Sequence, residues 1–455
     1  MTTWAHDAIF YHIYPLGLCG APRRNDFVAA PEPRLAQIHT WIEHLQTLHV
    51  NALYLGPLFE SGTHGYDTAD YYQVDRRLGT NQTLTELVAA LHAAGIRVIL
   101  DGVFHHVGRD FWAFRDLQAR GADSPYRDWF VGIDFNGHSP YGDPFGYAGW
   151  RGNYDLVKLN LQHPEVRAHL FGAVQFWIEQ FGIDGLRLDV AEDIELDFLR
   201  DLAAYCRRAH PDFWLLGEVI HGDYTRWANA ETLDAVTNYE NYKGLFSSHN
   251  DRNYFEIAYS LNRQFGEHGL YRDIPLYTFA DNHDVSRVAN ALHNPAHLYP
   301  LYALLFTMPG VPSIYYGSEW GISGIKQPAD DWSLRPCLTG PTALPEAAQP
   351  ELAATIAQLA RIRQQMGALR RGSYRQLSVA AEQVAFARQW EDEYVVVAVN
   401  AADTPAALRL PVNLPDGQTF GDQLAPDQQF TVHNGTLLLE TVPAYGARIL
   451  APRAA

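Results

Sequence analysis

Short apolar runs rich in β-branched and aromatic residues alternate along the chain with segments whose apolar residues recur at helical spacing. The runs that predict β-strands are Ala8–Tyr14, Asn51–Leu55, Arg97–Leu100, a run that ends at Asp189, Trp214–Glu218, Ala235–Asn238, Pro275–Phe279 and Pro312–Tyr316. The segments that predict helices are Leu35–Leu48, Leu84–Ala94, Pro164–Gln180, Leu196–Arg208, Pro300–Met308 and Leu352–Gln365. Because strands and helices alternate along the chain, we expect the strands to form a parallel sheet.

Eight such units, each with polar residues at the end of its strand, predict a (β/α)₈ TIM barrel. The alternative is an open, doubly wound sheet, which would carry a glycine-rich phosphate-binding turn after an early strand. The sequence has no such turn there.

The alternation is interrupted twice. Residues 107–155 are rich in Gly, Pro, Asp and aromatic residues, and we expect an insertion subdomain over the end of the third strand. From Gly372 onward, short β-type runs separated by turn residues predict a C-terminal antiparallel β-sandwich. The expected domains are therefore a barrel of residues 1–106 and 156–371, an insertion of residues 107–155, and a sandwich of residues 372–455.

Composition narrows the function classes. The net charge of −18 and the scattered basic residues argue against nucleic acid or an anionic membrane as a partner. Cys19, Cys206 and Cys337 are too few and too scattered for a disulfide framework or a metal site, and they fit a reducing cytoplasm. We find neither a signal-peptide pattern nor an apolar run long enough to span a bilayer, so we expect a cytoplasmic protein.

Arg187 and Asp189 are the first candidate site residues. Residues two apart on a strand share one face, so both side chains would lie together at a strand end. A nearby arginine lowers the pKa of a buried carboxyl and holds it ionised. Taken alone, the pair is either a structural ion pair or a carboxylate kept ready as a nucleophile.

Other polar residues follow the neighbouring strands, and in a barrel all of them would meet at one mouth. They are His64, Tyr66 and Asp67 after the second strand, Asp101 and His106 after the third, Glu218 after the fifth, and Asp281, Asn282, His283 and Asp284 after the seventh. Crowded carboxyls push their pKa values apart, which gives the acid and nucleophile pair that glycoside hydrolysis needs. A dinuclear metal site is the competing interpretation. It is weaker because Arg187 would face the cation, so we expect neither a metal nor a cofactor.

Four segments in order resemble the four signature regions of the α-amylase superfamily, glycoside hydrolase family thirteen. They are Asp101-Gly-Val-Phe-His-His106, Gly185-Leu-Arg187-Leu-Asp189, Gly217-Glu218-Val219 and Phe279-Ala-Asp-Asn-His283-Asp284. One such motif is weak support, but four in order at the ends of strands three, four, five and seven are strong. The resemblance covers nearly the whole chain.

The resemblance implies the catalytic roles. Asp189 would be the nucleophile, Glu218 the general acid/base, and Asp284 the third carboxylate, which binds sugar hydroxyls and distorts the ring. Arg187 would orient Asp189. The reaction would be a retaining double displacement, with the carboxyls of Asp189 and Glu218 roughly 5–5.5 Å apart.

The resemblance also implies an oligosaccharide substrate and residues that bind it. His106 and His283 would hydrogen-bond the sugar that is cleaved, Tyr66 would stack on its face, and Asp101 would support the site. His105 stands where calcium-dependent α-amylases usually have an asparagine ligand. Imidazole is a poor calcium ligand, so we expect no calcium there.

Two stretches indicate a subgroup. Leu156-Val-Lys158-Leu-Asn160 is similar to a motif of the neopullulanase, cyclomaltodextrinase and maltogenic amylase group, and His221 fits that group. Glu192 and Asp193 differ from its usual Asn and Glu, which implies a different +1 subsite. The group usually carries an N-terminal β-sandwich used for dimerisation, whereas this sequence begins almost at the first predicted strand. Whether the protein is a homodimer stays open.

Three functional hypotheses therefore stay open. The first is a hydrolase of cyclic or short α-glucans, mainly at α-1,4 bonds and with α-1,6 bonds as further targets. The second is a glucanotransferase or glucoside isomerase of the same family. The third is a non-catalytic binding or scaffold protein, which is disfavoured because all three carboxylates are present.

Overall fold

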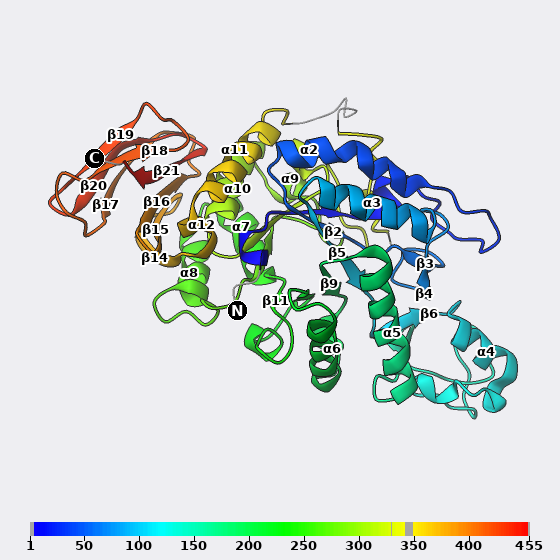
Figure 1. Cartoon of the computed structure of the whole chain (residues 1–455). Helices are drawn as coiled ribbons and strands as arrows, with labels where there is room; N and C mark the ends of the chain where they lie inside the picture. The colour runs from blue at the N-terminus through cyan, green and yellow to red at the C-terminus, as the bar shows by residue number, and fades with distance from the viewer. Residues whose placement is uncertain (1–3, 329, 342–348, 454–455) are drawn as a thin grey trace.

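Eight parallel strands form a nearly closed barrel in the computed structural model, which describes residues 4–328, 330–341 and 349–453 (Figure 1). The strands are β1 (Phe10–Ile13), β2 (Ala52–Leu55), β5 (Arg97–Gly102), β9 (Gly185–Leu188), β10 (Trp214–Gly217), β11 (Ala235–Val236), β12 (Tyr277–Phe279) and β13 (Val311–Tyr315). Their hydrogen-bonded order is β11-β10-β9-β5-β2-β1-β13-β12. A parallel bridge between Thr237 and Tyr277 joins the two edge strands. The predicted TIM barrel is confirmed.

Apolar side chains fill both faces of these strands, which explains why the runs read as continuously hydrophobic. Phe10, Tyr54, Trp214 and Tyr277 belong to the cluster that fills the barrel interior. Alternate residues such as Leu53 point the other way and join the larger core under the helices.

The helices surround the barrel, and five of the six predicted ones lie within a few residues of their predicted ends. These helices of the barrel are α1 (Pro15–Leu18), α2 (Ile42–Thr47), α3 (Asn81–Ala93), α5 (Pro164–Phe181), α6 (Leu196–Ala209), α7 (Tyr239–Asn250), α8 (Tyr254–Phe265), α9 (Val288–Ala291), α10 (Leu298–Thr307), α11 (Leu352–Gln365) and α12 (Gly367–Arg371). The pattern did not predict α1, α7, α8, α9 and α12 as separate helices. The helix predicted over Leu35–Leu48 differs, because residues Arg34–Trp41 form a 3₁₀ helix before α2 begins. A helical end tightened to 3₁₀ geometry keeps the apolar side chains Leu35, Ile38 and Trp41 buried.

The region after β5 forms a small antiparallel sheet and a helix, at the lower right of Figure 1. The sheet has the order β6-β8-β7, from β6 (His106–Gly108), β7 (Gly149–Trp150) and β8 (Asn153–Lys158), and α4 (Trp112–Arg120) packs beside it. A hairpin of β3 (Phe59–Ser61) and β4 (Thr68–Val74), which the strand pattern did not predict, lies after β2.

The C-terminal part is an eight-stranded antiparallel sheet, as predicted, at the left of Figure 1. Its order is β14-β15-β16-β21-β18-β19-β20-β17, from β14 (Ser373–Val379), β15 (Gln383–Trp390), β16 (Glu393–Asn400), β17 (Ala406–Pro411), β18 (Thr419–Asp422), β19 (Gln429–His433), β20 (Thr436–Val442) and β21 (Gly446–Pro452). Phe386 and Val397 point into the core shared with the barrel helices, whereas Ala387 and Val396 face a separate core of the sheet. Among the helices of the described residues, none has the length and apolar character that a membrane span requires.

Candidate active site

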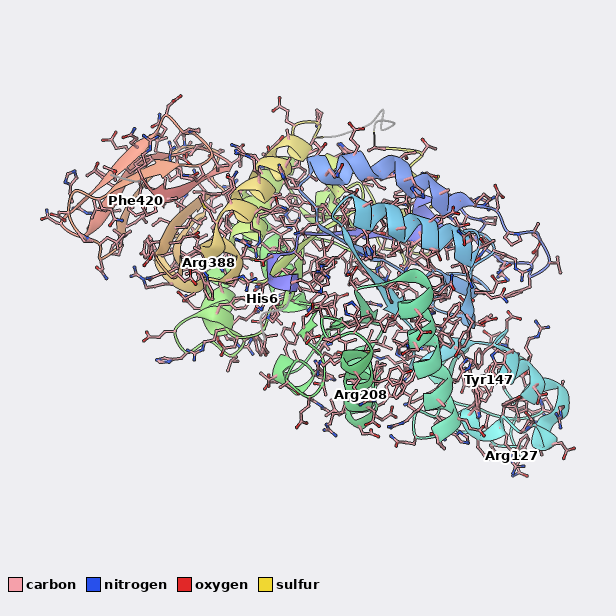
Figure 2. All side chains as sticks on the ribbon, viewed as in Figure 1. His6, Arg127, Tyr147, Arg208, Arg388 and Phe420 are labelled. Atoms are coloured by element: carbon pink, nitrogen blue, oxygen red, sulfur yellow. The ribbon has the colours of Figure 1, made fainter. Side chains whose placement is uncertain are left out.

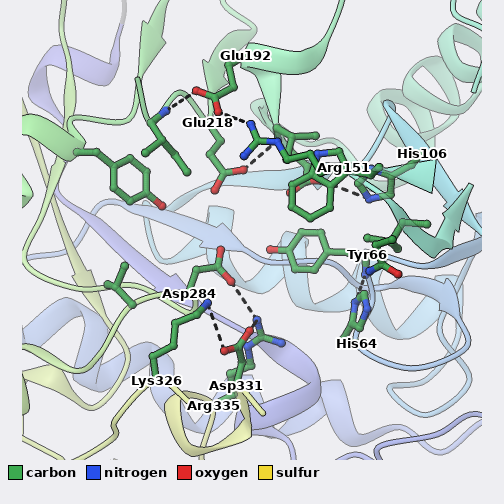
Figure 3. A pocket seen from close by; sticks show the side chains of 18 residues that line it. His64, Tyr66, His106, Arg151, Glu192, Glu218, Asp284, Lys326, Asp331 and Arg335 are labelled. Atoms are coloured by element: carbon green, nitrogen blue, oxygen red, sulfur yellow. Dashed lines mark hydrogen bonds and ion pairs between the residues drawn. The ribbon is translucent and has the colours of Figure 1, made fainter. Parts of the chain in front are cut away.

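A cavity of about 400 Å³ opens at the carboxyl ends of the barrel strands (Figure 3). Seven of the predicted residues line it: His64, Tyr66, His106, Asp189, Glu192, Glu218 and Asp284. Parallel strands present their carboxyl ends at the same mouth, so side chains far apart in sequence meet there.

Arg187 lies beneath this cavity and is shared by three carboxylates. Its Nη1 atom lies 2.8 Å from Asp101 Oδ1 and 2.9 Å from Asp189 Oδ1, and its Nη2 atom lies 2.9 Å from Glu218 Oε1. All four side chains are buried. One planar guanidinium therefore orients both Asp189 and Glu218.

The backbone just after Asp189 provides a second hold on Glu218. Val190 adopts a left-handed conformation with φ of 42°, which is unfavourable for a β-branched residue. In this conformation its N–H donates to Glu218 Oε2 at 3.0 Å. A strained backbone conformation persists where the surrounding structure enforces it. Here the strained conformation of Val190 directs its N–H at the second carboxylate oxygen of Glu218.

Asp101 supports the floor of the site and does not line the cavity. Its Oδ2 atom accepts from the Tyr54 hydroxyl at 2.7 Å and from the Tyr66 hydroxyl at 3.0 Å. Tyr66 stacks on the His283 ring with centroids 5.5 Å apart and also hydrogen-bonds it. The ring of Tyr66 is thus fixed at the cavity wall.

The pKa values of the three central carboxyls differ. Burial raises the pKa of Glu218 above its ordinary value, against the effect of Arg187. Burial likewise raises the pKa of Asp189 well above its ordinary value, because Arg187 opposes this only in part and the neighbouring carboxyls add to it. Arg187 does lower the pKa of Asp189, as expected, but burial outweighs it and the net shift is upward. The expectation left out burial and the sharing of one cation among three carboxylates.

Asp284 behaves in the opposite way. Burial raises its pKa, but His283 and Arg335 outweigh burial and hold the pKa well below its ordinary value. His283 Nε2 lies 2.9 Å from Asp284 Oδ2, and Arg335 Nη2 lies 3.1 Å from Asp284 Oδ1. Asp284 is thus an ionised carboxylate opposite a pair that retains protons more strongly.

His106 faces the cavity as a neutral ring. Burial, with the neighbouring His105 and His64 adding to it, lowers the pKa of His106 well below its ordinary value. Its Nε2 atom has no hydrogen-bond partner among the residues that the structure describes, and it lies 3.7 Å from Asp189 Oδ2. This nitrogen is free to bond a ligand beside Asp189.

Other predicted binding residues do not reach the cavity. Lys158 pairs with His106 across β6 and β8 through the backbone. It lies near His105, whose pKa falls to about 4 through burial and then through Lys158. His221 is exposed, and its backbone N–H donates to Glu192 Oε2 at 3.2 Å. Asp193 accepts from Trp150 Nε1 at 2.9 Å.

Several wall residues were not among the predicted ones. They are Trp150, Arg151, Tyr239, Lys326, Asp331 and Arg335. Trp150 and Arg151 lie in the insertion, Tyr239 is the first residue of α7, and the other three follow β13. No periodic pattern indicates which way these side chains point. Only the aromatic richness of the insertion hinted at Trp150.

The described residues contain no group of three or more His, Cys, Asp and Glu side chains arranged to hold a metal ion. The carboxylates at the mouth instead converge on Arg187. This donor set is that of an acid–base site at the mouth of a barrel.

The comparisons with known proteins identify the family. The model of the α-amylase catalytic domain matches residues 34–366. The chain is 32% identical to a cyclomaltodextrinase of Bacillus sp. over 93% of this chain and 77% of that protein. It is also 32% identical to neopullulanase 2 of Thermoactinomyces vulgaris, over 97% and 77% of the two chains. The solved cyclic α-maltosyl-(1→6)-maltose hydrolase of Arthrobacter globiformis superposes with a TM-score of 0.81 at 29% identity, over 99% of this chain and all of that one. The chain is therefore a glycoside hydrolase. It belongs to the α-amylase family.

Proposed function

We propose that this glycoside hydrolase cleaves α-glucosidic bonds of cyclic or short α-glucans, mainly α-1,4 bonds, with retention of configuration. The observation that carries the proposal is that Asp189 and Glu218 bond opposite nitrogens of one guanidinium, at 2.9 Å each, in the wall of one cavity. The names of the relatives, cyclomaltodextrinase and neopullulanase, support the substrate class.

In the proposed reaction, a carboxylate oxygen of Asp189 attacks the anomeric carbon, and the bond to the leaving oxygen breaks. The pair reacts in the form that carries one proton, with that proton on Glu218 and Asp189 ionised. Glu218 gives this proton to the leaving oxygen, and its raised pKa favours the protonated form from which it does so. The result is a covalent glycosyl-enzyme. Glu218 then takes a proton from water, which attacks the same carbon and releases Asp189.

The remaining residues stabilise the sugar in this scheme. Asp284, held ionised by His283 and Arg335, accepts hydrogen bonds from sugar hydroxyls. His106 offers its Nε2 atom to the sugar beside Asp189, and Tyr66 provides a ring face for stacking.

The experiment is turnover of maltotriose and cyclodextrin by the wild-type protein and by Asp189→Asn and Glu218→Gln. Each variant should lose about 10³-fold or more of kcat. Asp128→Asn, at an exposed carboxylate of the insertion, is the control and should keep wild-type turnover.

The first product seen by NMR should carry the α-configuration. A β-product, or full turnover without Asp189, would contradict the proposal. A ladder of longer products would instead identify a glucanotransferase.

We also propose that the enzyme works in a reducing compartment such as the cytoplasm. Cys19, Cys206 and Cys337 are all free thiols, and two of them are buried. Activity should be the same with and without dithiothreitol, and a loss on reduction would argue against the proposal.

A further inference from the structure

A set of ion pairs crosses the cavity wall beside Glu218 (Figure 3). We call it the Arg151 bridge, and it consists of Arg151, Glu192 and Asp193. Arg151 lies in the turn between β7 and β8 of the insertion, and both acids follow β9 of the barrel. Its Nη2 atom lies 2.7 Å from Glu192 Oε1, and its Nε atom lies 3.1 Å from Asp193 Oδ2. The bridge therefore ties the insertion to the barrel.

Protein donors occupy the two carboxylates of the bridge. Glu192 Oε2 accepts the backbone N–H groups of Ile220 at 3.0 Å and His221 at 3.2 Å. Asp193 Oδ2 also accepts from Trp150 Nε1. Glu192 and Asp193 were predicted to shape the +1 subsite, and that stays a prediction. Their protein contacts make them parts of the wall beside Glu218.

The turn that carries Arg151 is shaped to hold its guanidinium in this place. Arg151 has a φ of 47°, a left-handed conformation that is unfavourable for a residue with a side chain. The guanidinium lies 5.4 Å from the centroid of the Trp150 ring, and that ring lies 5.8 Å from the His106 ring. The bridge is thus continuous with the residues around the proposed cleavage point.

The bridge lies on the side where the leaving group departs. Ile220 and His221, which Glu192 holds, follow directly on Glu218 and Val219. Because Glu218 protonates the leaving oxygen in the proposed reaction, the sugars beyond that oxygen must pass this loop. Across the cavity, Lys326 pairs with Asp331 at 3.3 Å, so charged pairs bound both sides (Figure 3).

We propose that Arg151 is a specificity-determining residue whose bridge closes the leaving-group end of the cavity against long α-glucans. The inference rests on the proposed function. A long glucan places several sugars beyond the cleaved bond, where the bridge stands, whereas maltotriose places one or two. Opening the bridge should favour the long substrate and leave the chemistry at Asp189 unchanged.

The test compares kcat/KM on amylose with kcat/KM on maltotriose for the full-length enzyme. Arg151→Ala should raise the ratio of amylose to maltotriose about five- to tenfold, since it removes two partly exposed ion pairs. Arg151→Lys, which keeps one cation, should restore most of the wild-type ratio. Arg127→Ala is the matched control, because Arg127 lies in the same insertion (Figure 2) and its side chain is 51% exposed, against 52% for Arg151.

An unchanged ratio in Arg151→Ala would overturn the inference. An equal loss of turnover on both substrates would also overturn it, because Arg151 would then support the catalytic carboxylates and not limit chain length. If the wild-type protein cleaved neither substrate, the proposed function would fail first. Raising the ionic strength supplies a test without substitution: it should raise the wild-type ratio and leave that of Arg151→Ala unchanged.

Discussion

At the scale of single residues, the site depends on how many carboxylates share one buried cation. Arg187 bonds Asp101, Asp189 and Glu218, so three carboxylates share one positive charge. Asp284 has two partners, His283 and Arg335, of which Arg335 also pairs with Asp331 at 3.5 Å. The protons therefore stay on the Arg187 side of the cavity and leave the Asp284 side. This asymmetry matches what an acid and a sugar-binding carboxylate each require.

The pH profile should reflect these shifts. Burial raises the pKa of Asp189 well above its ordinary value and also raises that of Glu218, and the two titrate as a pair. Below the lower pKa of the pair both carboxyls are protonated and the nucleophile is lost. Above the upper pKa both are ionised and the acid is lost. The pH values at which kcat/KM falls on the acid side and on the alkaline side should therefore both lie above about 4, the ordinary pKa of free carboxyls.

A pH–rate profile on maltotriose measures both limits. Glu218→Gln, assayed with an aryl glycoside whose leaving group needs no protonation, should lose only the upper limit. A profile whose optimum lies below about pH 4 would contradict the raised pKa values.

Two substitutions distinguish the role of the Tyr66 ring from the role of its hydroxyl. Tyr66→Phe keeps the ring at the cavity wall and loses the bonds to Asp101 and His283. It should lower the free energy of unfolding by about 1 kcal/mol and change KM little. Tyr66→Leu removes the stacking face and should raise KM about 3- to 10-fold. The checks are Michaelis kinetics and urea unfolding, and equal KM values for the two variants would exclude stacking.

At the scale of elements, side-chain caps set helix boundaries that apolar periodicity does not reveal. Helix α3 was predicted to begin at Leu84 but begins at Asn81, because Thr80 and Thr83 form a reciprocal capping box. The Thr80 hydroxyl accepts the N–H of Thr83, and the Thr83 hydroxyl accepts the N–H of Thr80. The helix thus starts with polar residues ahead of its first buried leucine.

Thr80→Ala should therefore cost about 1 kcal/mol of unfolding free energy. Gln82→Ala, at an exposed position of the same turn, should change it by less than about 0.5 kcal/mol. Chemical denaturation of both variants measures the difference. Equal effects would mean that the capping box does not stabilise α3.

At the scale of the whole molecule, the C-terminal sheet and the barrel share one core. Alternate residues of β15 and β16 point to opposite faces, and Phe386, Val395 and Val397 join the core that contains the barrel helices. Arg388, buried on the same sheet, donates to the carbonyl of Thr307 at the end of α10. We therefore expect the two parts to unfold together.

Phe386→Ala should lower the free energy of unfolding by about 3–5 kcal/mol and lower the temperature of a single transition of the whole protein. Leu438→Ala, on an exposed position of the same sheet, should change it by less than about 0.5 kcal/mol. Calorimetry distinguishes the outcomes. Two separate transitions, of which Phe386→Ala moves only one, would show that the sheet folds independently.

The sequence by itself determined the barrel, the C-terminal antiparallel sheet and seven of the residues that line the cavity. Apolar periodicity is local, and strand ends in a parallel barrel share one mouth, so motifs at those ends can be assembled without coordinates. The tertiary structure alone decided which charges meet. Arg335 reaches Asp284, Arg151 crosses to Glu192, and burial reverses the pKa shift expected for Asp189. Ion pairing and desolvation depend on distances between segments that are far apart in sequence, and no local pattern encodes those distances.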